Sequence, residues 1–261
     1  MYAAERQELI EQLLSDDGRV SVQDLSDRFG VTTETVRRDL DALERAGALR
    51  RVHGGAVAHA NHSTIEPTVT ERSHRRTQAK AAIASRALEA LGNGFRGSVF
   101  FDAGTTTAAV AELLPARLAA TGGTAEVVTH SLSLAPGLAA ADRVALTVVG
   151  GRVRGVTAAA VGAGTVRTIG GLRPDIVFVG TNGISAAFGL STPDSEEAAV
   201  KEALVRAARR VVLVADAGKF GAESLVRFAG LDDIDVLVTD VAPTGTLAAA
   251  LADAGTEVWV A

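Results

Sequence analysis

Two kinds of hydrophobic patterning divide this chain. Residues 1–57 carry short segments in which apolar positions recur every three to four residues, the spacing of amphipathic helices. From about residue 94 onward, short apolar runs alternate with longer helical segments. Runs that are apolar at every position are typical of strands buried on both faces of a parallel sheet. The pattern therefore predicts a small helical module followed by an α/β layered domain.

The α/β part has seven runs that we expect to form strands, with helical segments between them. The strand runs are "SVFFDAG", "AEVVTH", "VALTVVGG", "DIVFVGTNG", "RVVLVADAG", "DVLVTD" and "EVWVA". The intervening helical segments include "TTAAVAELLPARLAA", "SEEAAVKEALVRAA" and "TGTLAAALADAG".

A polar stretch containing a proline separates the two regimes. It reads "HANHSTIEPTVTERSHRRTQ" and leads into a helical segment, "AKAAIASRALEAL". We therefore expect a module over residues 1–57, a linker over 58–77 and an α/β domain over 78–261.

The N-terminal module has the pattern of a helix-turn-helix. Ser21 can cap its second helix, with Asp24 three residues later, and Gly30 can end that helix. Thr32 can cap the third helix, whose inward-facing positions, at i, i+4 and i+7, are Val36, Leu40 and Leu43. Two amphipathic helices joined by a short turn containing glycine form a helix-turn-helix.

The third predicted helix turns polar residues away from the core, and its first turn is where a recognition helix contacts base edges. Arg38 suits a bidentate contact to guanine and Arg37 a phosphate contact, although the pattern leaves open which arginine takes which role. Asp39 and Asp41 lie further round, where we expect them to balance the charge of the helix locally. The expected DNA-contacting positions of this helix are Thr33, Glu34, Thr35, Arg37 and Arg38.

A basic hairpin is expected after the third helix. The stretch from Leu49 to Val57 reads as two short strands that turn at Gly54 and Gly55. A hairpin beside a recognition helix is the winged form of the motif, and it would contact the DNA backbone or minor groove. Its expected DNA-contacting residues are Arg50, Arg51 and His53.

Charge weighs against a simple DNA-binding interpretation. Residues 1–57 hold 8 arginines against 11 acidic residues, and the whole chain has a net charge of −5, whereas DNA-binding domains are usually basic. The arginines are nevertheless concentrated in the last third of the module, at Arg37, Arg38, Arg45, Arg50 and Arg51. We therefore favour DNA binding over the alternative, a helical module that docks on another protein.

The first strand-to-helix turn of the α/β domain is a candidate anion-binding site. "FFDAGTTTAAVAELL" is a strand that runs into a helix through a Gly-Thr-Thr-Thr turn. Backbone N–H groups and threonine hydroxyls at a helix N-terminus can bind a phosphate. The turn matches neither a Walker A loop nor a GxGxxG fingerprint, so a small phosphate ester fits it better than ATP or a dinucleotide. The alternative is an ordinary capped helix start.

Further polar turns follow the later strands, and the carboxyl ends of such strands converge on a crevice where ligands bind. Asn182 can bond sugar hydroxyls, while Arg152 and Lys219 supply positive charge. For Glu196 and Glu197 we favour the usual role of acids in a helix's first turn. The expected ligand-binding residues are Asp102, Gly104, Thr105, Thr106, Thr107, Gly151, Arg152, Asn182, Lys201, Asp216 and Lys219.

Composition narrows the chemistry further. The chain has no cysteine, which excludes disulfides and cysteine-based metal centres. Its five histidines form no HxxxH pair, so we expect no metal site, and no cofactor is indicated. The charged N-terminus lacks a signal sequence and no apolar run is long enough to span a membrane, so we expect a cytoplasmic protein.

On these motifs the chain resembles the DeoR/GlpR-type transcriptional regulators of sugar metabolism. The resemblance covers nearly the whole chain. It rests on "RVSVQDLSDRFGVTTETVRRDLDALERAGALRRVHGGA" and, in order, on "FDAGTTT", "VVGGRVR", "FVGTNGIS", "GLSTPD", "EAAVKEALV" and "VADAGKFG". It implies a winged helix-turn-helix joined to a sensor domain similar to the ribose-5-phosphate isomerase and CoA-transferase fold. The implied partners are operator double-stranded DNA and a phosphorylated sugar effector. The implied action is that of a repressor, working as a homodimer or homotetramer.

The resemblance also implies roles for individual residues. Recognition-helix arginines would be Arg37 and Arg38, and the linker arginine would be Arg72. The Gly-Thr-Thr effector loop would be Gly104, Thr105 and Thr106, and the Asp…Lys-Phe turn would be Asp216, Lys219 and Phe220. The family often has two asparagines where this chain has "THS", so a sugar contact at His130 is left open.

Two further expectations concern the effector and catalysis. The opening "MYAAERQ" is similar to regulators found beside fructose-utilisation genes, which indicates fructose 1-phosphate. The sensor fold leaves a sugar-phosphate isomerase as the alternative, with Asp194, Glu196 or Glu197 as its base. An attached DNA-binding module makes catalysis unnecessary, so we expect a regulator and not an enzyme.

Overall fold

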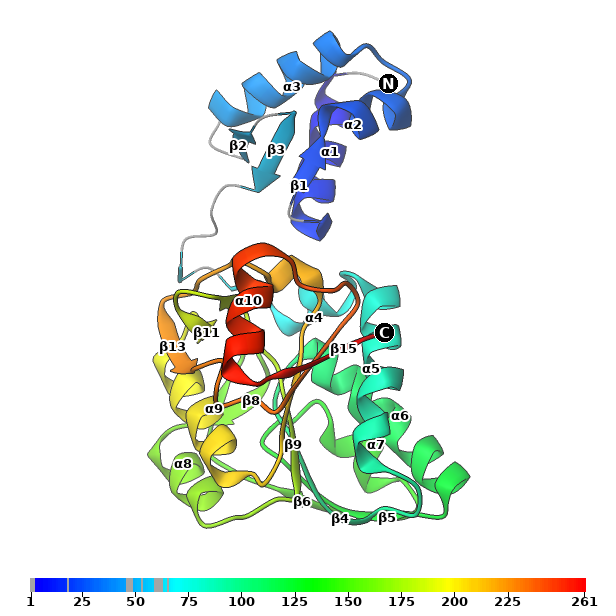
Figure 1. Ribbon diagram of the computed structural model, residues 1–261, viewed down its shortest axis with the longest axis vertical. Helices are drawn as coiled ribbons and strands as arrows, with labels where there is room; N and C mark the ends of the chain where they lie inside the picture. Colours follow the sequence, from blue (N-terminus) through cyan, green and yellow to red (C-terminus); the bar gives the residue numbers. More distant parts are fainter. Residues whose placement is uncertain (1–2, 18, 46–48, 53, 59–62, 65) are drawn as a thin grey trace. The chain divides into compact units, whose positions relative to one another are not determined.

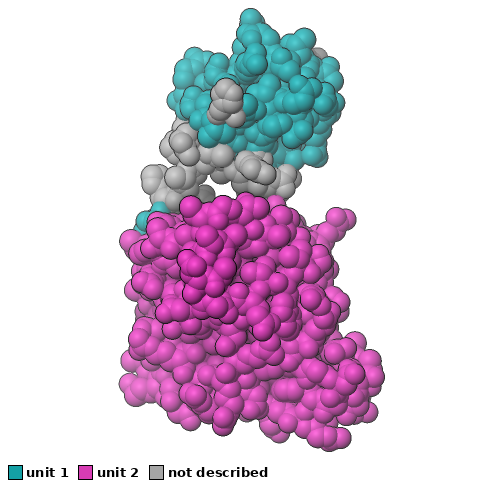
Figure 2. Space-filling model, viewed as in Figure 1, with its two compact units in different colours: residues 1–65 teal, residues 66–261 magenta. Residues whose placement is uncertain are grey.

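The chain folds into two compact units, Met1–Ile65 and Glu66–Ala261 (Figure 2). A computed structural model describes residues 3–17, 19–45, 49–52, 54–58, 63–64 and 66–261. None of the helices in these ranges is long and apolar enough to cross a lipid bilayer.

The first unit is a winged helix-turn-helix (Figure 1). Its helices are α1 (Ala3–Asp17), α2 (Val22–Phe29) and α3 (Thr33–Arg45). Its strands are β1 (Arg19–Ser21), β2 (Leu49–Val52) and β3 (Gly55–Ala58), in the antiparallel order β1-β3-β2.

The expected helix boundaries of this unit are confirmed. The Ser21 hydroxyl accepts the Asp24 N–H at 3.0 Å, and Gly30 ends α2 in the left-handed region at φ 62°. The Thr32 hydroxyl accepts the Thr35 N–H at 3.2 Å at the start of α3. The buried core is Ile10, Leu14, Val22, Leu25, Val36, Leu40, Leu43, Leu49 and Ala56.

Two features of this unit were not expected. Asp39 does not balance charge on the helix surface; it is buried and forms an ion pair with Arg6 of α1, with 2.5 Å between Nε and Oδ2. The reason is its position, three residues after the buried Val36 and thus on the same face. The second feature is β1, whose close approach to β3 requires a glycine at position 55, because a Cβ there would lie 2.0 Å from the Val20 carbonyl oxygen.

A seven-stranded parallel sheet forms the centre of the second unit. Its order is β15-β14-β12-β9-β4-β5-β6, and every neighbouring pair is parallel. All seven expected runs form this sheet, as β4 (Arg96–Phe101), β5 (Thr124–Thr129), β6 (Val144–Val148), β9 (Ile176–Val179), β12 (Val211–Val214), β14 (Val236–Thr239) and β15 (Glu257–Val260). The expected α/β fold class is confirmed.

Helices cover both faces of the sheet (Figure 1). One face packs against α5 (Thr77–Ala87), α6 (Thr105–Thr121) and α7 (Ala135–Ala139). The other packs against α8 (Ala163–Gly170), α9 (Ser195–Ala207) and α10 (Gly245–Ala254). The remaining helices are short: α4 (Val69–Ser73), η1 (Leu88–Leu91) and η2 (Ala217–Lys219).

Two small antiparallel sheets were not expected from the sequence. One pairs β7 (Arg152–Arg154) with β8 (Ala159–Val161). The other contains β10 (Gly183–Ser185), β11 (Gly189–Thr192) and β13 (Val226–Ala229). Each strand has three or four residues, too few to show a period.

Part of the stretch expected as a linker is folded onto the second unit. α4 begins with a capping box, in which the Thr68 hydroxyl accepts the Glu71 N–H and the Glu71 carboxylate accepts the Thr68 N–H. The Val69 N–H donates to the Val156 carbonyl at 2.7 Å. Residues 66–73 are thereby attached to the loop between β7 and β8.

The sheet order reverses between β4 and β9. From β4 the chain continues to β5 and β6 on one side, while β9, β12, β14 and β15 follow on the other. In open α/β sheets the ligand crevice lies at the carboxyl ends of the strands at such a switch point. The loops that follow β4, β9 and β12 are therefore the place to look for a binding site.

Candidate functional site

The outward face of α3 presents two arginines. Burial of Val36 and Leu40 fixes the rotation of the helix and leaves Arg37 and Arg38 exposed. The Arg38 side chain is 79% exposed, and its Nε lies 3.3 Å from Glu34 Oε1 one turn earlier. Thr33 and Thr35 are partly buried beside them. This face is exposed to solvent, where a guanidinium can contact a base edge or a phosphate.

Of the three expected wing residues, the structure describes the side chain of Arg51. The Arg51 guanidinium is held by Asp41 and by the Arg37 carbonyl, at 3.3 Å from the latter. Asp41 therefore forms an ion pair with Arg51 of the wing, and its charge does not act on α3 alone. His53 lies outside the described residues, and Arg50 is placed in β2 by its backbone only.

A buried charge pair lies at the switch point. Asp102 follows β4 and is fully buried, and its carboxylate is paired with the Lys201 ammonium of α9. Lys201 also donates to the Gly180 carbonyl at 3.0 Å, and the Gly180 N–H donates to Asp102 Oδ2 at 3.0 Å. Burial alone would raise the pKa of Asp102, but Lys201 and the His130 hydrogen bond outweigh it and lower the pKa to about 2.

This pair gives a structural role to two residues that the sequence assigns to the ligand, and their contact with a ligand stays a prediction. Asp102 and Lys201 were expected to contact a ligand, yet they are 0% and 4% exposed and bond each other. A buried charge needs a partner of opposite sign, and each supplies it for the other. They join the ends of β4 and β9 to α9 inside the protein.

The Gly-Thr-Thr-Thr turn has a similar division of roles. Thr107 was also expected to contact the ligand, but it is fully buried and its hydroxyl bonds the carbonyls of Asp102 and Gly104, at 2.8 and 2.9 Å. Thr105 and Thr106 are only partly buried, in the first turn of α6. Any contact between this turn and an anion therefore falls to these two threonines and the N–H groups of that turn.

His130 is part of the protein's interior. It is 2% exposed, its Nδ1 lies 2.9 Å from the Ala160 carbonyl oxygen, and its Nε2 lies 3.1 Å from the Ala103 backbone nitrogen. Nε2 also lies 3.1 Å from Asp102 Oδ1. The residue that stands in place of the family's asparagine pair therefore holds the ends of β4 and β8 together and does not face a sugar.

Asp216 and Lys219 lie in a cluster of cations at the end of β12. Buried Asp216 accepts a hydrogen bond from Arg76 Nη1 at 2.9 Å and from the Gly218 N–H at 3.0 Å. Burial lowers the pKa of Lys219; Asp216 opposes this, and Arg72, Arg75 and Arg76 lower it further.

Lys80 belongs to the same cluster. It is buried in α5, and its ammonium donates to the Arg72 carbonyl. Burial lowers its pKa to about 8, and nearby Lys219 and Arg72 act in the same direction. Sequence reasoning missed Lys80 as a site residue, although it is one of three lysines in the chain and follows "HRR" closely.

Several donors of this cluster have no acceptor within the described ranges. Arg72 Nε and Nη2 are buried and make no hydrogen bond there. No bond or ion pair is found for the Lys219 ammonium in the same part of the chain. Buried donors are normally satisfied, and guanidinium groups bond phosphate and carboxylate oxygens strongly. The cluster can therefore bind an anion.

Asn182 and Arg152 are placed differently from each other. Asn182 follows β9, accepts a hydrogen bond from the Thr192 hydroxyl at 3.0 Å and donates to Glu66 at 3.5 Å. Arg152 is 61% exposed and pairs with Glu196, so its charge is shared with an acid.

Gly151 has a packing role. A Cβ at this position would lie 2.0 Å from Thr165 Oγ1 and 2.8 Å from the Val161 carbonyl oxygen. The glycine lets the chain approach α8 closely after β6. Its expected contact with a ligand stays a prediction, as do those of the other site residues.

Arg154 and Glu66 were both missed. Arg154 Nη1 lies 2.5 Å from Glu66 Oε2 and 3.2 Å from Glu197 Oε1, and its Nε lies 3.2 Å from Asp194 Oδ2. Asp194 also caps α9. Arg154 could have been predicted as a site residue, because it is the second arginine of the "GGRVR" turn. No local sequence pattern identifies Glu66 as a site residue.

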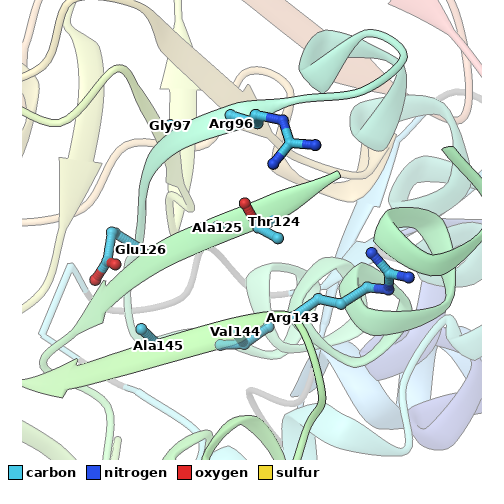
Figure 3. A pocket seen from close by; sticks show the side chains of 8 residues that line it. All are labelled: Arg96, Gly97, Thr124, Ala125, Glu126, Arg143, Val144 and Ala145. Atoms are coloured by element: carbon cyan, nitrogen blue, oxygen red, sulfur yellow. The ribbon is translucent and has the colours of Figure 1, made fainter. Parts of the chain in front are cut away.

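A separate hollow of about 510 Å³ lies at the other end of the sheet (Figure 3). It is formed where β4, β5 and β6 begin, whereas Asp102 and His130 follow the ends of β4 and β5. It is therefore distinct from the candidate site. Its lining residues are Arg96, Gly97, Thr124, Ala125, Glu126, Arg143, Val144 and Ala145.

A winged helix-turn-helix with outward arginines, followed by an α/β unit with a cation cluster at the end of β12, is the architecture of a DNA-binding regulator with a sensor domain. Family comparison agrees. Residues 6–62 match the DeoR-like helix-turn-helix domain, and residues 75–241 match the DeoR C terminal sensor domain. The chain belongs to the DeoR family of transcriptional regulators.

Its relatives align along nearly their whole length. The HTH-type transcriptional regulator GlpR of Haloferax volcanii is 41% identical over 92% of this chain and 91% of its own. The uncharacterized HTH-type transcriptional regulator FruR of Bacillus subtilis is 32% identical over 92% of both chains. The glycerol-3-phosphate regulon repressor of Escherichia coli K12 is 30% identical over 97% of both.

The chain is a transcriptional regulator of DeoR/GlpR type and not an enzyme. Ribose 5-phosphate isomerase A of Methanocaldococcus jannaschii superposes on 55% of this chain and 54% of its own, with a TM-score of 0.41 and 14% identity. That likeness is too distant to support any argument about activity.

Proposed function

We propose that this regulator represses a sugar-utilisation operon and releases the operator when a phosphorylated sugar binds the second unit. The observation that supports it most is the cation cluster at the end of β12. There Arg72 has two buried donors without an acceptor in the described ranges, and Lys219 has a pKa lowered by burial and by neighbouring arginines. A phosphate dianion would supply the missing acceptors.

Each part of such an effector has a suitable partner. Arg72 and Lys219 would bind the phosphate, together with the first turn of α6 at Thr105 and Thr106. Asn182, at the end of the neighbouring strand, would bind a sugar hydroxyl. One relative is named the glycerol-3-phosphate regulon repressor, and the opening "MYAAERQ" indicates fructose 1-phosphate. We therefore place fructose 1-phosphate and glycerol 3-phosphate first among the candidates.

The DNA side of the proposal rests on α3. Arg38 would read a base edge and Arg37 would contact phosphate. Closed oligomers place such helices at the spacing of operator half-sites, so a homodimer or homotetramer is the expected form. The effector acts by binding one arrangement of that oligomer more tightly than the other, since only a difference in affinity can shift an equilibrium.

A thermal-shift panel tests the effector site. The full chain is heated with fructose 1-phosphate, glycerol 3-phosphate and ribose 5-phosphate, and with unphosphorylated fructose and glycerol. A ligand at 100 times its Kd stabilises the folded state by about 2.7 kcal/mol, so a phosphate ester should raise the midpoint and its free sugar should not.

Two variants make the panel specific. Lys219→Met should remove the shift, while Arg167→Met, which deletes an exposed cation on α8, should leave it intact. The proposal fails if no phosphate ester shifts the wild type, or if Lys219→Met responds as the wild type does.

A further inference from the structure

A carboxylate of the chain itself lies among the groups of the candidate site. Glu66 is the first residue of the second unit, and its side chain is only 3% exposed. Its Oε2 lies 2.5 Å from Arg154 Nη1. Its Oε1 lies 3.5 Å from Arg72 Nη1 and 3.5 Å from Asn182 Nδ2. We call these three contacts the Glu66 clasp.

The two arginines of the Glu66 clasp differ in how many carboxylates they contact. Arg154 faces three carboxylates, those of Glu66, Asp194 and Glu197, so it stays neutralised when Glu66 leaves. Arg72 has Glu66 as its ion-pair partner at 3.5 Å, with Nε and Nη2 unbonded in the described part of the chain. The contacts of Glu66 to Arg72 and Asn182 are therefore the long ones, and Arg72 has two further donors unbonded in the described part of the chain.

Anionic oxygen is the chemistry that Arg72 and Asn182 share. A guanidinium and an amide N–H₂ both donate to carboxylate and to phosphate oxygens. Glu66 places a carboxylate oxygen between Arg72 and Asn182. Because Glu66 is part of the same chain, this oxygen is always close to both groups. A phosphate ester that bonds Arg72 fully would compete with that oxygen.

We propose that Glu66 is a tethered competitor of the effector, so that binding of a phosphate ester releases the Glu66 clasp. The inference rests on the proposed function, because it assigns regulation to the same site. Glu66 directly follows the first unit in the chain, and the next attachment of this stretch is the Val69 N–H on the Val156 carbonyl. Release of Glu66 therefore frees the chain segment that leads to the DNA-binding unit.

Calorimetric titration of the full chain with inorganic phosphate, and separately with glycerol 3-phosphate, measures the competition. Glu66→Gln removes the competing charge and should lower the Kd of these probes about fivefold or more, the lower end of typical coupling between two sites. Glu112→Gln is the matched control, since Glu112 is exposed on α6 and its substitution should leave the Kd unchanged. An equal or higher Kd for Glu66→Gln would overturn the inference.

Hydrogen exchange gives a second readout that does not depend on the affinity of a variant. In the wild type, saturating phosphate should raise amide exchange over residues 66–70, while Glu66→Gln should show the raised exchange without phosphate. Protection of this segment that is unchanged by phosphate in the wild type would contradict the clasp. If Glu66→Gln proves unstable, Glu66→Asp, one methylene shorter, should shift the Kd in the same direction.

The two levels of the proposal fail differently. If the wild type binds neither probe, nor fructose 1-phosphate or ribose 5-phosphate, the effector site itself is wrong and the clasp falls with it. If the wild type binds them in a manner that Lys219→Met abolishes, but Glu66→Gln changes neither the Kd nor the exchange, the effector site stands and the clasp alone is wrong.

Discussion

Asp39 of α3 and Arg6 of α1 form a buried ion pair, with 2.5 Å between Oδ2 and Nε and 3.1 Å between Oδ1 and Nη2. Both side chains are less than a tenth exposed. The pair joins the expected recognition helix to the first helix of the same unit. Asp39 is buried whereas Arg38, the residue before it, is exposed, so the pair can hold the helix in position while Arg38 faces solvent.

Removing one partner of this pair should destabilise the first unit. Asp39→Ala removes the carboxylate that is bonded to the buried Arg6 guanidinium, and breaking a buried ion pair costs roughly 3–5 kcal/mol. Urea unfolding followed by circular dichroism measures the loss. Replacing both partners, with Arg6→Met and Asp39→Leu together, should recover much of it. A loss below ~1 kcal/mol for Asp39→Ala would show that the pair is not buried in solution.

The two outward arginines should differ in how they affect DNA binding. Arg38→Ala should cost about 1–3 kcal/mol on the chain's own upstream DNA and relax its sequence preference, because a bidentate base contact is lost. Arg37→Ala should weaken all sequences alike and lower the salt slope by about one. Fluorescence anisotropy over a salt series measures both, with Arg167→Met as the control. The reverse pattern would exchange the two roles.

Lys219→Met should make the second unit more stable. A lysine whose pKa is lowered on folding binds its proton more tightly when unfolded, so its charge opposes folding at pH values below the folded pKa. Burial and three arginines lower the pKa of Lys219, and methionine removes that charge. The free energy of unfolding, measured with urea at pH 7, should rise. The gap to the wild type should narrow as pH rises through the pKa of Lys219. A less stable variant would contradict the proposed cost of this cation.

Asp102 should govern part of the acid sensitivity of the second unit. Its pKa is lowered to about 2 from 3.8, so its contribution to stability is complete above the unfolded pKa and is lost as pH falls through the folded one. Asp102→Asn should therefore be less stable than the wild type at pH 6. The difference should shrink between about pH 4 and pH 2.

Urea midpoints from pH 6 to pH 2 test this pH dependence. The control is Asp142→Asn, at an exposed position, which should show no such narrowing. A difference between Asp102→Asn and the wild type that stays constant over this range would indicate that Asp102 is not held as a carboxylate by Lys201.

The inner strands of the sheet could be predicted one by one because they are buried. Parallel strands covered by helices on both faces are apolar at successive positions, and runs such as "IVFV" and "VLVT" are buried at every residue in β9 and β14. The same holds for the helix ends at Ser21 and Gly30, where capping chemistry is local. Local signals of this kind are readable in one sequence.

The site could be predicted only in part, because it is built from distant segments. The turn residues after β4, β9 and β12 were predicted, because each apolar run is followed directly by polar turn residues. The partners of those residues were not: Lys201 is 99 positions from Asp102, and Arg154 is 88 positions from Glu66. Nor does the sequence give the strand order that brings β4 beside β9. Thus Asp102, Lys201 and Thr107 were recognised as important, but the bonds that hold them in the interior were not predicted.

The most direct test of the account is the affinity for upstream DNA as effector is added. Anisotropy at fixed salt should show the wild-type Kd for DNA rising about 5- to 150-fold with saturating fructose 1-phosphate or glycerol 3-phosphate, the range of a coupling of roughly 1–3 kcal/mol. Lys219→Met should bind the same DNA with wild-type affinity and show no rise. A wild-type affinity that no phosphate ester changes, or a Lys219→Met variant that responds fully, would contradict the account.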